Sequence, residues 1–510
     1  MSSETQEKTQ NYVNTEHLHY IFVLVIAIMY VITSAITRNP DGDCNFLISI
    51  GEYIVNNHKL PTENIWVIHD NFALTVQQWM VCVCNYMFFK LAGYNGILLL
   101  SIILVLIQSY VAYKYICVYT SNKKIIYSLL SVSLIMFSQF VCSRPHGFTI
   151  ILILLEQIAL EKFFRTSYSE KNEVKLLIQL GILSFIQMNF HSSMWAMIII
   201  FILPYVVPPI LELYDKNNSR EKIIALLKSV IVIILAGLIN PNFIDGILYV
   251  VRGYKNTIGN NLIAEMRPAS VAQLPGVFII LTISLLIITV LLKKCNKHLV
   301  YTTLGVLILS FMHIRNNWLL IIPIIPLSVI ILNSIPAVQS KDFVQSRKLV
   351  RNSIVIAYTL TSIGVAIFLL NKITQVEDDT QVFPVSIVEY LNENFGDKKE
   401  SLRLYTEYDN GAYLELNGYK CYIDSRAEIY EKDINGKEDI LDEYMDILSK
   451  NSRDVPAFID KYEFTHIAVI VTTPVAYYLQ YTPEEISGYK LVVDKPEKGY
   501  RLYEKIDFNK

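Results

Sequence analysis

The stretch ILLLSIILVLIQSYVAYKYICV, residues 97–118, contains 22 positions, and its one charged side chain is Lys114. A helix of about 20 apolar residues crosses the roughly 30 Å hydrocarbon core of a bilayer. Inside that core every backbone polar group needs an internal partner, which a helix provides. The stretch therefore predicts a transmembrane helix.

Comparable apolar blocks recur along the first 370 residues. About eleven of them approach the length of a span, and they cover residues 20–36, 97–118, 125–141, 147–164, 175–190, 194–211, 223–240, 275–292, 299–313, 317–335 and 350–370. Of the whole 510-residue chain, 53% is hydrophobic and 18% is charged, against about 45–50% and about 25% in soluble proteins. The sequence predicts a polytopic α-helical membrane protein with a transmembrane domain over residues 1–370.

Positive charges are concentrated in alternate loops between the apolar blocks, and these loops would all lie on one side of the membrane. Alternate loops are short and rich in Lys and Arg, as at 162–175 and 341–351, which is typical of cytoplasmic loops. This pattern predicts a cytoplasmic N-terminus and an extracytoplasmic C-terminus. The first run, 20–36, lacks a basic flank and a small-residue cleavage site, so we interpret it as a retained helix rather than a signal peptide. No strongly basic segment points to nucleic acid.

Two further regions lie on the predicted outer side. The first outer loop, 37–95, holds two amphipathic patterns, one after Asp43 and one after Thr75 that ends at Gly93; such helices can lie in the interface plane. Residues 371–510 form the predicted soluble α/β domain. Alternating apolar runs predict strands there, at 402–405, 413–416, 421–423, 466–471 and 490–493, with helices at 384–395 and 438–450.

Two carboxylates, Asp41 and Asp43, open the first outer loop directly after the first span. One of them can act as a general base and remove a proton from an attacking hydroxyl. The pair can also bind a divalent cation through hard oxygen ligands. Alternatively, Asp43 caps the helix that follows by accepting backbone N–H bonds. The residues alone leave these roles open.

Three arginines stand where spans meet the outer face: Arg144, Arg267 and Arg315. Positive charges are expected on the cytoplasmic side, whereas ionisable groups at this depth are costly and normally face a cavity. The planar fork of arginine suits phosphate and carboxylate groups. The arginines therefore predict a site for a lipid phosphate or diphosphate. The alternative is that they pair with Asp41, Asp43 and Glu265, or with lipid headgroups.

Polar companions occur at the same predicted depth, which indicates a polar outer cavity. They are His146, His191, His313 and Asn316. In the C-terminal domain, Asp409 lies in an expected turn, and Asp424 and Arg426 follow an expected strand. Those three residues predict either a lid over the outer cavity or a local salt bridge.

Several short motifs occur in an order that extends over most of the chain. They are Asp41-x-Asp43, Gly51-Glu52-Tyr53-Ile54, Pro61-Thr62, Trp79, Arg144-Pro145, Asn240-Pro241, Arg315-Asn316, Asp409-x-Gly411-x-Tyr413-Leu414 and Asp424-x-Arg426. In these motifs and in its predicted topology, the chain resembles the GT-C-fold membrane glycosyltransferases, and among them bacterial multi-spanning members of unassigned substrate. It departs from them at Leu47 and at Gln77-Gln78, where similar sequences often carry His and His-Glu.

The resemblance implies a cell-envelope enzyme of the bacterial plasma membrane. It would move a hexose or pentose from a polyprenyl-phosphate carrier to a lipid, glycan or protein acceptor on the outer face. Asp41 or Asp43 would be the base, and the three arginines would stabilise the leaving phosphate. One base suffices because the carrier phosphate leaves readily, which favours inversion. The family includes metal-dependent and metal-independent members, so a divalent cation, Mg²⁺ or Mn²⁺, stays open.

Two other functions share parts of this pattern. A transporter or flippase of lipid-linked sugars would have the same arginines, but it should also show inverted repeats and interrupted helices, and the sequence shows neither. A non-catalytic membrane assembly factor would need no carboxylate beside the arginines. We therefore expect an enzyme.

Overall fold

Two compact units make up the described chain. The computed structural model describes residues 24–25, 27–34, 40–138, 143–211, 220–253, 267–269, 274–334, 380, 382–449 and 454–506. The first unit draws on residues 1–39, 98–240 and 263–373, and the second unit on residues 40–97, 241–262 and 374–510. Residues 40–95 of the first outer loop predicted at 37–95 thus belong to the same unit as the C-terminal residues.

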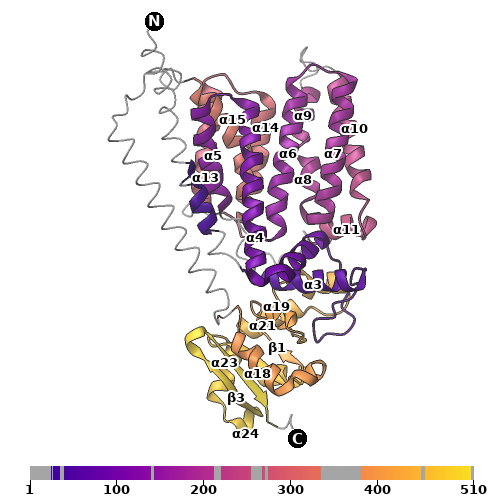
Figure 1. Cartoon of the computed structure of the whole chain (residues 1–510), viewed down its shortest axis with the longest axis vertical. Helices are drawn as coiled ribbons and strands as arrows, with labels where there is room; N and C mark the ends of the chain where they lie inside the picture. Colours follow the sequence, from indigo (N-terminus) through magenta and orange to yellow (C-terminus); the bar gives the residue numbers. More distant parts are fainter. Residues whose placement is uncertain are drawn as a thin grey trace, which may run out of the picture. The chain divides into compact units, whose positions relative to one another are not determined.

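The first unit is helical (Figure 1). Its main elements are the C-terminal part of α4 (Trp79–Tyr119), α5 (Lys123–Phe137), α6 (Pro145–Arg165), α7 (Glu170–His191), α8 (Ala196–Ile200), α9 (Leu203–Leu211), α10 (Arg220–Gly237), α13 (Leu274–Leu291), α14 (Lys297–Met312) and α15 (Ile321–Leu332), with the 3₁₀ turns η2 (Ser192–Met194) and η4 (Ile314–Leu320). A helix therefore lies at each predicted span that the structure describes fully. The predicted span 350–370 lies outside the described residues.

In the part of the chain that is described, three helical stretches are long and apolar enough to cross a membrane. They are Trp79–Tyr119, Glu170–Met194 and Ile314–Leu332. The other helices are shorter or more polar: α14 has 16 residues, and the 21 residues of α6 include Glu156, Glu161 and Arg165. The chain is mostly helical and carries helices that can span a membrane.

Within the predicted span 194–211 an apolar helix covers Ala196–Val207, and its regular hydrogen bonding changes between Ile200 and Leu203. Helix α8 ends at Ile200 and α9 begins at Leu203. Pro204 has no N–H, so it cannot donate to the carbonyl four residues earlier and the ladder stops. The backbone forms a tighter turn of the 3₁₀ type there. The N–H of Tyr205 donates to the carbonyl of Ile202, three residues earlier, at 3.0 Å.

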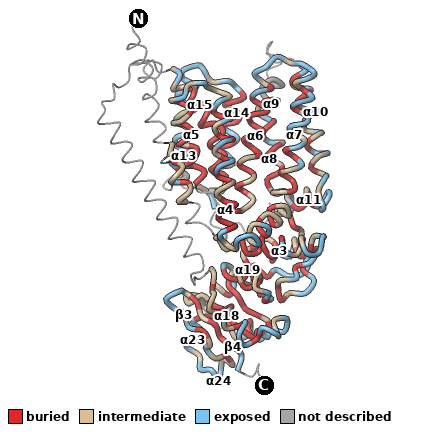
Figure 2. Tube along the Cα trace, in the orientation of Figure 1, coloured by how far each residue is buried: buried red, intermediate tan, exposed pale blue. Residues whose placement is uncertain are grey.

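Helix α7 packs against both α6 and α10. The indole N–H of Trp195 donates to Ser184 Oγ, and that hydroxyl donates to the carbonyl of Ile233, each at 2.7 Å. A Cβ on Gly237 would lie 2.7 Å from the Trp195 ring, so only glycine lets α10 approach the indole this closely. Buried positions follow the inner sides of these helices in Figure 2.

Helices α3 (Asp43–Asn57) and α4 begin the second unit, which also holds α11 (Phe243–Gly253). The prediction of two helices after Asp43 and Thr75 is confirmed. The helical geometry of α4 breaks at Ala92 and Gly93, where Gly93 has φ +59°, a backbone region that glycine enters freely. A Cβ on Gly51 would lie 2.1 Å from the carbonyl oxygen of Cys82, so α3 and α4 meet backbone to backbone.

A four-stranded sheet forms the core of the C-terminal part of the second unit (Figure 1). The strands are β1 (Leu404–Tyr405), β2 (His466–Ile470), β3 (Tyr489–Lys495) and β4 (Tyr500–Lys505), in the order β1-β2-β4-β3. Strands β1 and β2 are parallel, and the other two pairs are antiparallel. The helices are α18 (Val385–Phe395), α19 (Gly411–Leu416), α20 (Lys432–Asn435), α21 (Ile440–Ser449), α22 (Val455–Tyr462), α23 (Pro474–Tyr481) and α24 (Glu484–Ser487).

The sheet bears out the α/β prediction for this region, although strand β4 was not predicted and two of the expected strands are absent from it. Strands were expected at 402–405, 466–471 and 490–493, and β1, β2 and β3 lie there. The expected strand 413–416 is instead part of helix α19. A run this short does not reveal its period, and its Leu and Glu residues are strong helix formers. The stretch 421–423 contributes single bridges from Cys421 to Val67 and to Leu404.

Candidate functional site

The N-terminus of α3 carries the acidic pair. The backbone N–H of Cys44 donates to Asp41 Oδ1 at 3.0 Å, which is the bond that a helix-capping side chain accepts. Asp41 thus takes part in capping this helix, a role that the sequence had left open for Asp43. Asp43 is the first residue of α3 and lies in its first turn.

Loops of the C-terminal segment lie beside this helix end, within the same unit. A Cβ on Gly42 would lie 3.5 Å from the carbonyl oxygen of Asp409. Burial raises the pKa of Tyr408, and the negative charges of Asp43 and Asp424 raise it further. The structure thus brings together the predicted residues Asp41, Asp43, Asp409 and Asp424. Burial also raises the pKa of Asp409.

The guanidinium of Arg426 lies at the centre of a buried polar network. Its Nε donates to both carboxylate oxygens of Asp424, at 3.0 and 2.9 Å, and its Nη2 donates to Glu415 Oε2 at 2.9 Å. The Tyr430 hydroxyl donates to Asp424 Oδ2 at 2.7 Å. Asp424 is 0% exposed and Arg426 is 4% exposed. The interpretation of Asp424 and Arg426 as a local salt bridge is confirmed.

Burial has the largest influence on the charges of this network. Burial and the Asp424 charge raise the pKa of Glu415 well above its usual value. Burial acts upward on Asp424 as well, but the Arg426 charge and its hydrogen bonds hold the pKa of Asp424 below its usual value. The Arg426 charge thus favours the carboxylate form of Asp424, whereas burial favours the neutral form of Glu415. The charges of Asp424 and Arg426 neutralise each other, as the burial of a charged group requires.

The Arg426 network also joins segments that are far apart in the sequence. The guanidinium lies 5.5 Å from the centre of the Phe46 ring and 5.9 Å from that of Trp66. Phe46 belongs to α3 and follows Asp43 by one turn, so Arg426 holds the helix that presents the acidic pair. Sequence patterns did not indicate Glu415, Phe46 or Trp66 as members of this group, because nothing local links them to residue 426.

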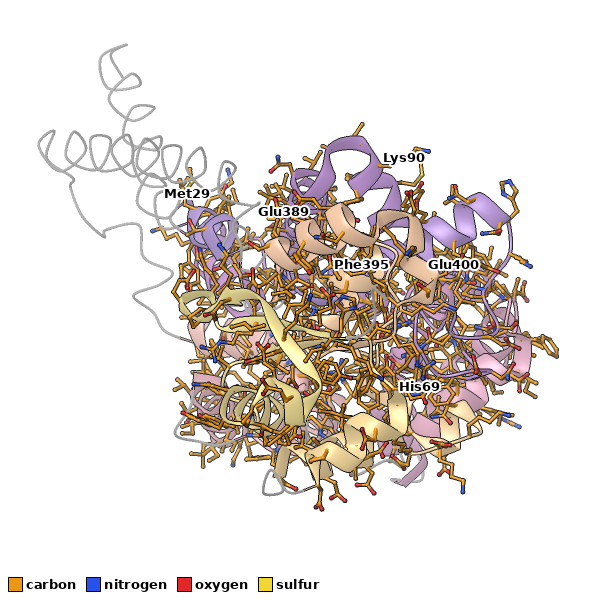
Figure 3. All side chains as sticks on the ribbon, turned by 90° about the horizontal axis from the view of Figure 1, so that it is seen from below. Met29, His69, Lys90, Glu389, Phe395 and Glu400 are labelled. Atoms are coloured by element: carbon orange, nitrogen blue, oxygen red, sulfur yellow. The ribbon has the colours of Figure 1, made fainter. Side chains whose placement is uncertain are left out.

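His69 fixes the segment between α3 and α4 to the C-terminal segment. Its Nε2–H donates to the carbonyl of Tyr422 at 2.8 Å. The ring stacks on Phe72 at 4.8 Å and meets Tyr422, Tyr430 and Tyr462 edge-on. Figure 3 labels His69 among the side chains of this region. Burial lowers the pKa of His69 to about 4, so the imidazole is neutral.

This histidine predicts a loss of stability in acid. The unfolded imidazole takes up a proton near its ordinary pKa of 6.5, whereas the folded one does so only near 4. Stability therefore falls as the pH drops from 6.5 towards 4, by about 2 kcal/mol at pH 5. Chemical unfolding of the wild type and of His69→Gln at pH 7.5 and pH 5 measures this. The stability advantage of the wild type should shrink in acid; an advantage that is equal at both pH values would contradict the assignment.

In the first unit, the first of the three predicted arginines lies at the N-terminus of helix α6. Arg144 immediately precedes Pro145, the first residue of α6. Arg315 lies in η4, and its Nη2 donates to His146 Nε2 at 3.0 Å. The backbone of Arg267 lies alongside, since Ile314 N–H donates to its carbonyl at 2.9 Å. The three arginines predicted from the sequence thus belong to adjacent backbone segments of the first unit.

His146, the hydrogen-bond partner of Arg315, lies beside a second buried histidine, His191. The rings of His146 and His191 lie 4.8 Å apart, with exposed fractions of 8% and 5%. His191 Nδ1 is 2.7 Å from Thr149 Oγ1, which also accepts a bond from Gln187 Nε2 at 3.1 Å. An arginine can only donate, so His146 accepts at Nε2 and is neutral. Gln187 and Thr149 were missed, although each lies one helical turn from a predicted histidine.

The remaining predicted residues have structural contacts of their own. Asn316 donates through Nδ2 to the carbonyl of Leu309 at 3.0 Å. His313 precedes η4, and its carbonyl accepts the N–H of Asn316 at 3.0 Å. Glu265 lies outside the described residues. Together, His313 and Asn316 fix the turn that presents Arg315.

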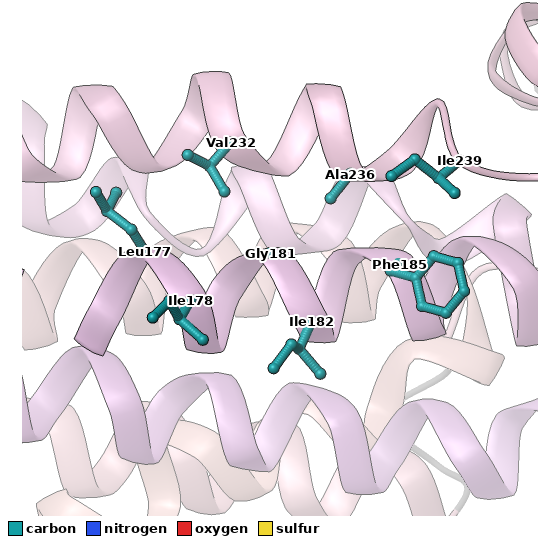
Figure 4. Close-up of a pocket in the computed structure, with 8 residues that line it drawn as sticks. All are labelled: Leu177, Ile178, Gly181, Ile182, Phe185, Val232, Ala236 and Ile239. Atoms are coloured by element: carbon teal, nitrogen blue, oxygen red, sulfur yellow. The ribbon is translucent and has the colours of Figure 1, made fainter. Parts of the chain in front are cut away.

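An apolar groove runs between α7 and α10 (Figure 4). It is lined by Leu177, Ile178, Gly181, Ile182, Phe185, Val232, Ala236 and Ile239. No side chain in this lining can donate or accept a hydrogen bond. The groove therefore suits a hydrocarbon chain and cannot itself recognise a phosphate or a sugar.

The described residues do not favour a metal centre. Among them, no group of three or more His, Cys, Asp or Glu side chains could hold a metal ion. Asp41, one of the two carboxylates considered for a cation, uses Oδ1 to accept the Cys44 N–H.

Comparison with known proteins identifies no relative. No protein-family model matches the sequence, and no curated protein sequence is significantly similar to it. Function is therefore inferred from the arrangement of the residues themselves.

Proposed function

We propose that the chain is an inverting membrane glycosyltransferase that takes a sugar from a polyprenyl-phosphate carrier. It would cross the bacterial plasma membrane about eleven times, with a cytoplasmic N-terminus and with the second unit on the outer side. The acceptor would be a lipid, glycan or protein of the cell envelope. The carrier phosphate and the acceptor hydroxyl are the two groups that the chain must recognise.

The arginine cluster of the first unit carries this proposal. Arg144 stands at the N-terminus of α6, where unpaired N–H groups and the helix dipole favour an anion. Arg315 lies beside His146, and Arg267 is held to the same turn through Ile314. As the bond to the sugar breaks, charge grows on the carrier phosphate, and fixed positive groups stabilise that charge. Neutral His146 holds the Arg315 guanidinium without cancelling its charge.

Asp43 is our choice for the base that accepts the proton of the attacking hydroxyl. Oδ1 of Asp41 is engaged in capping α3, whereas Asp43 stands in the first turn with Asp409 and Asp424 in the same unit. The hydroxyl oxygen attacks the anomeric carbon, the bond to the phosphate oxygen breaks, and the proton passes to Asp43. The arginines take up the negative charge of the released carrier phosphate.

Transfer of a labelled sugar from a synthetic polyprenyl-phosphate donor, by the purified full chain in detergent, tests the proposal. Envelope glycans and lipids from cells with and without the gene, compared by mass spectrometry, identify the acceptor. Loss of a sugar-bearing species from the cells that lack the gene is the expected result. An unchanged glycan and lipid profile, together with no transfer in vitro, would remove the case for this enzyme.

Arg315→Ala should weaken donor binding. A charge-assisted hydrogen bond contributes about 1.5–3 kcal/mol, so the dissociation constant should rise by roughly 10–150-fold. Arg501→Ala is the matched control, because Arg501 pairs with Asp494 in the other unit. Titration of the donor against both variants measures the difference. Equal affinity in Arg315→Ala and the wild type would refute the phosphate site.

A transporter or flippase of lipid-linked sugars is the second candidate. The change in hydrogen bonding between α8 and α9 favours it, since transporters use broken helices around their sites. It would bind the same donor through the same arginines, but it would release the donor intact on the other side. Donor that crosses proteoliposomes without losing its sugar would favour this alternative. A non-catalytic assembly factor would show neither activity.

A further inference from the structure

Glu407 is a buried acidic side chain in the second unit, two residues after β1. It is 1% exposed, and its Oε2 accepts the Tyr444 hydroxyl of α21 at 2.8 Å. Tyr405 of β1, Thr473 before α23 and Asp409 of the following turn also face it. None of these groups is a cation, and a buried carboxylate without a cation is costly. The site therefore favours the neutral acid, and burial raises the pKa of Glu407 to about 7.

Tyr444 connects this acid to the turn that follows it. The Tyr444 hydroxyl accepts the N–H of Tyr408 at 3.2 Å while it donates to Glu407. Within the turn, the carbonyl of Glu407 accepts the N–H groups of Asn410 and Gly411, each at 3.2 Å. The N–H of Glu407 donates in return to Asn410 Oδ1 at 3.0 Å. Glu407 and Tyr444 therefore hold the backbone of the turn 408–411.

The turn 408–411 lies against the start of α3, within the same unit. A Cβ on Gly42 would lie 3.5 Å from the carbonyl oxygen of Asp409, and Gly42 directly precedes Asp43. Helix α19, which follows the turn, packs against α3 (Figure 1). Its last residue, Leu416, packs against the hydrophobic cluster that contains Cys44 of α3. A displacement of the turn would therefore disturb the helix end that carries Asp43.

We propose that Glu407 is a positioning residue whose proton holds the turn 408–411, and with it Asp43, in place at the proposed catalytic site. The neutral acid fits its buried site, and Tyr444 stays between it and the turn. Loss of the proton leaves a negative charge among hydroxyls and beside Asp409, and opening of the turn to water relieves that charge. The effect on the reaction rate rests on the proposed function, whereas the effect on the turn does not.

The direction of the pH effect follows from proton linkage. In an open turn Glu407 meets water and has its ordinary pKa of 4.5, whereas in the closed turn of the structure its pKa is about 7. Between these values the closed turn binds a proton that the open turn does not, so the closed turn loses stability as the pH rises. From pH 5 to pH 7.5, the ratio of open to closed turns should rise by roughly 50-fold. Glu407→Gln has no proton to lose and should remove this dependence.

Hydrogen–deuterium exchange of the full chain in detergent tests the proposal without an assay of activity. Peptides that cover 40–50 and 405–417 are followed at pH 5 and pH 7.5 in the wild type and in Glu407→Gln. Because the variants are compared at the same pH, the direct effect of pH on exchange cancels. The exchange rate of the wild type relative to Glu407→Gln should rise by roughly 50-fold between the two pH values. Glu393→Gln is the matched control, since Glu393 is exposed on α18 of the same unit, and its ratio to the wild type should stay constant.

Tyr444→Phe keeps the proposal testable if Glu407→Gln fails to fold. It deletes only the hydroxyl that joins Glu407 to the turn, so both peptides should exchange roughly 2–12-fold faster, as expected for the loss of one hydrogen bond. The control is Tyr390→Phe, because the Tyr390 hydroxyl also donates to a glutamate, Glu504, elsewhere in the unit. It should leave both peptides unchanged.

Initial rates of sugar transfer give the readout at the site itself. The rate of the wild type relative to Glu407→Gln should fall from pH 5 to pH 7.5, and a purely structural role would leave this ratio constant. A constant exchange ratio, a constant rate ratio, or unchanged exchange in Tyr444→Phe would each overturn the positioning role. Absence of transfer from every variant would instead refute the proposed enzyme, and the exchange rates alone would then decide the role of Glu407 in the turn.

Discussion

Replacing Asp43 by asparagine should slow sugar transfer by about 10²–10⁴-fold, the usual contribution of a general base. Asparagine keeps the shape of the side chain and its first-turn position in α3 but removes its basicity. The matched variant is Asp41→Asn. Asparagine is as good a capping residue as aspartate, so it should still accept the Cys44 N–H and leave the rate within a few-fold of wild type.

Initial rates of transfer from a synthetic polyprenyl-phosphate donor, at several donor concentrations, separate the two variants. Loss of the base should lower kcat and leave donor affinity nearly unchanged. The reverse order, with Asp41→Asn slow and Asp43→Asn active, would move the base to the capping residue. Full turnover by the double variant would end the case for either aspartate as a base.

Removing Arg426 should produce the largest loss of stability in the second unit. Breaking a buried ion pair by deleting one partner costs about 3–5 kcal/mol, because the other charge stays buried and uncompensated. Arg426→Gln leaves Asp424, which is 0% exposed, without its cation. Arg426→Lys keeps the charge but loses the fork that binds Asp424 and Glu415 together, so it should rescue stability in part.

Arg501→Gln is the control for Arg426→Gln. Arg501 pairs with Asp494, whose side chain is 48% exposed, and such surface pairs contribute about 0–1 kcal/mol. Denaturant unfolding, followed by tryptophan fluorescence, compares the variants, since Trp66 lies 5.9 Å from the Arg426 guanidinium. Similar losses from Arg426→Gln and Arg501→Gln would show that the network does not hold the unit together.

Local patterns predicted much of this molecule. The helices after Asp43 and Thr75, the break at Gly93 and three of the strands follow from periodicity and from glycine. The arginines were chosen because positive charge at the outer ends of spans is unusual, and their backbones meet in one unit. These features depend on residues that are close together in the sequence, so local sequence patterns are enough to predict them.

Other features depend on partners distant in the sequence, and they were missed or misassigned. The sequence offered capping as one role for Asp43, and the side chain that accepts the Cys44 N–H belongs to Asp41, a difference of two positions that patterns do not resolve. The 413–416 run became α19 because its surroundings, including Ile423 against Gly411, decide between helix and strand. The Arg426 network gathers Glu415, Phe46 and Trp66 from three segments, and no local spacing reveals such a group.

The contact between His69 and Tyr422 joins positions 353 residues apart, and this separation sets an order of events during synthesis. Ribosomes add roughly 5–20 residues per second, so the C-terminal partner follows the segment that holds His69 by roughly 20–70 s. Throughout that interval His69 and Trp66 have no Tyr422 or Arg426 to pack against. The nascent segment therefore stays exposed to proteases and chaperones until the C-terminal segment has been synthesised and completes its fold.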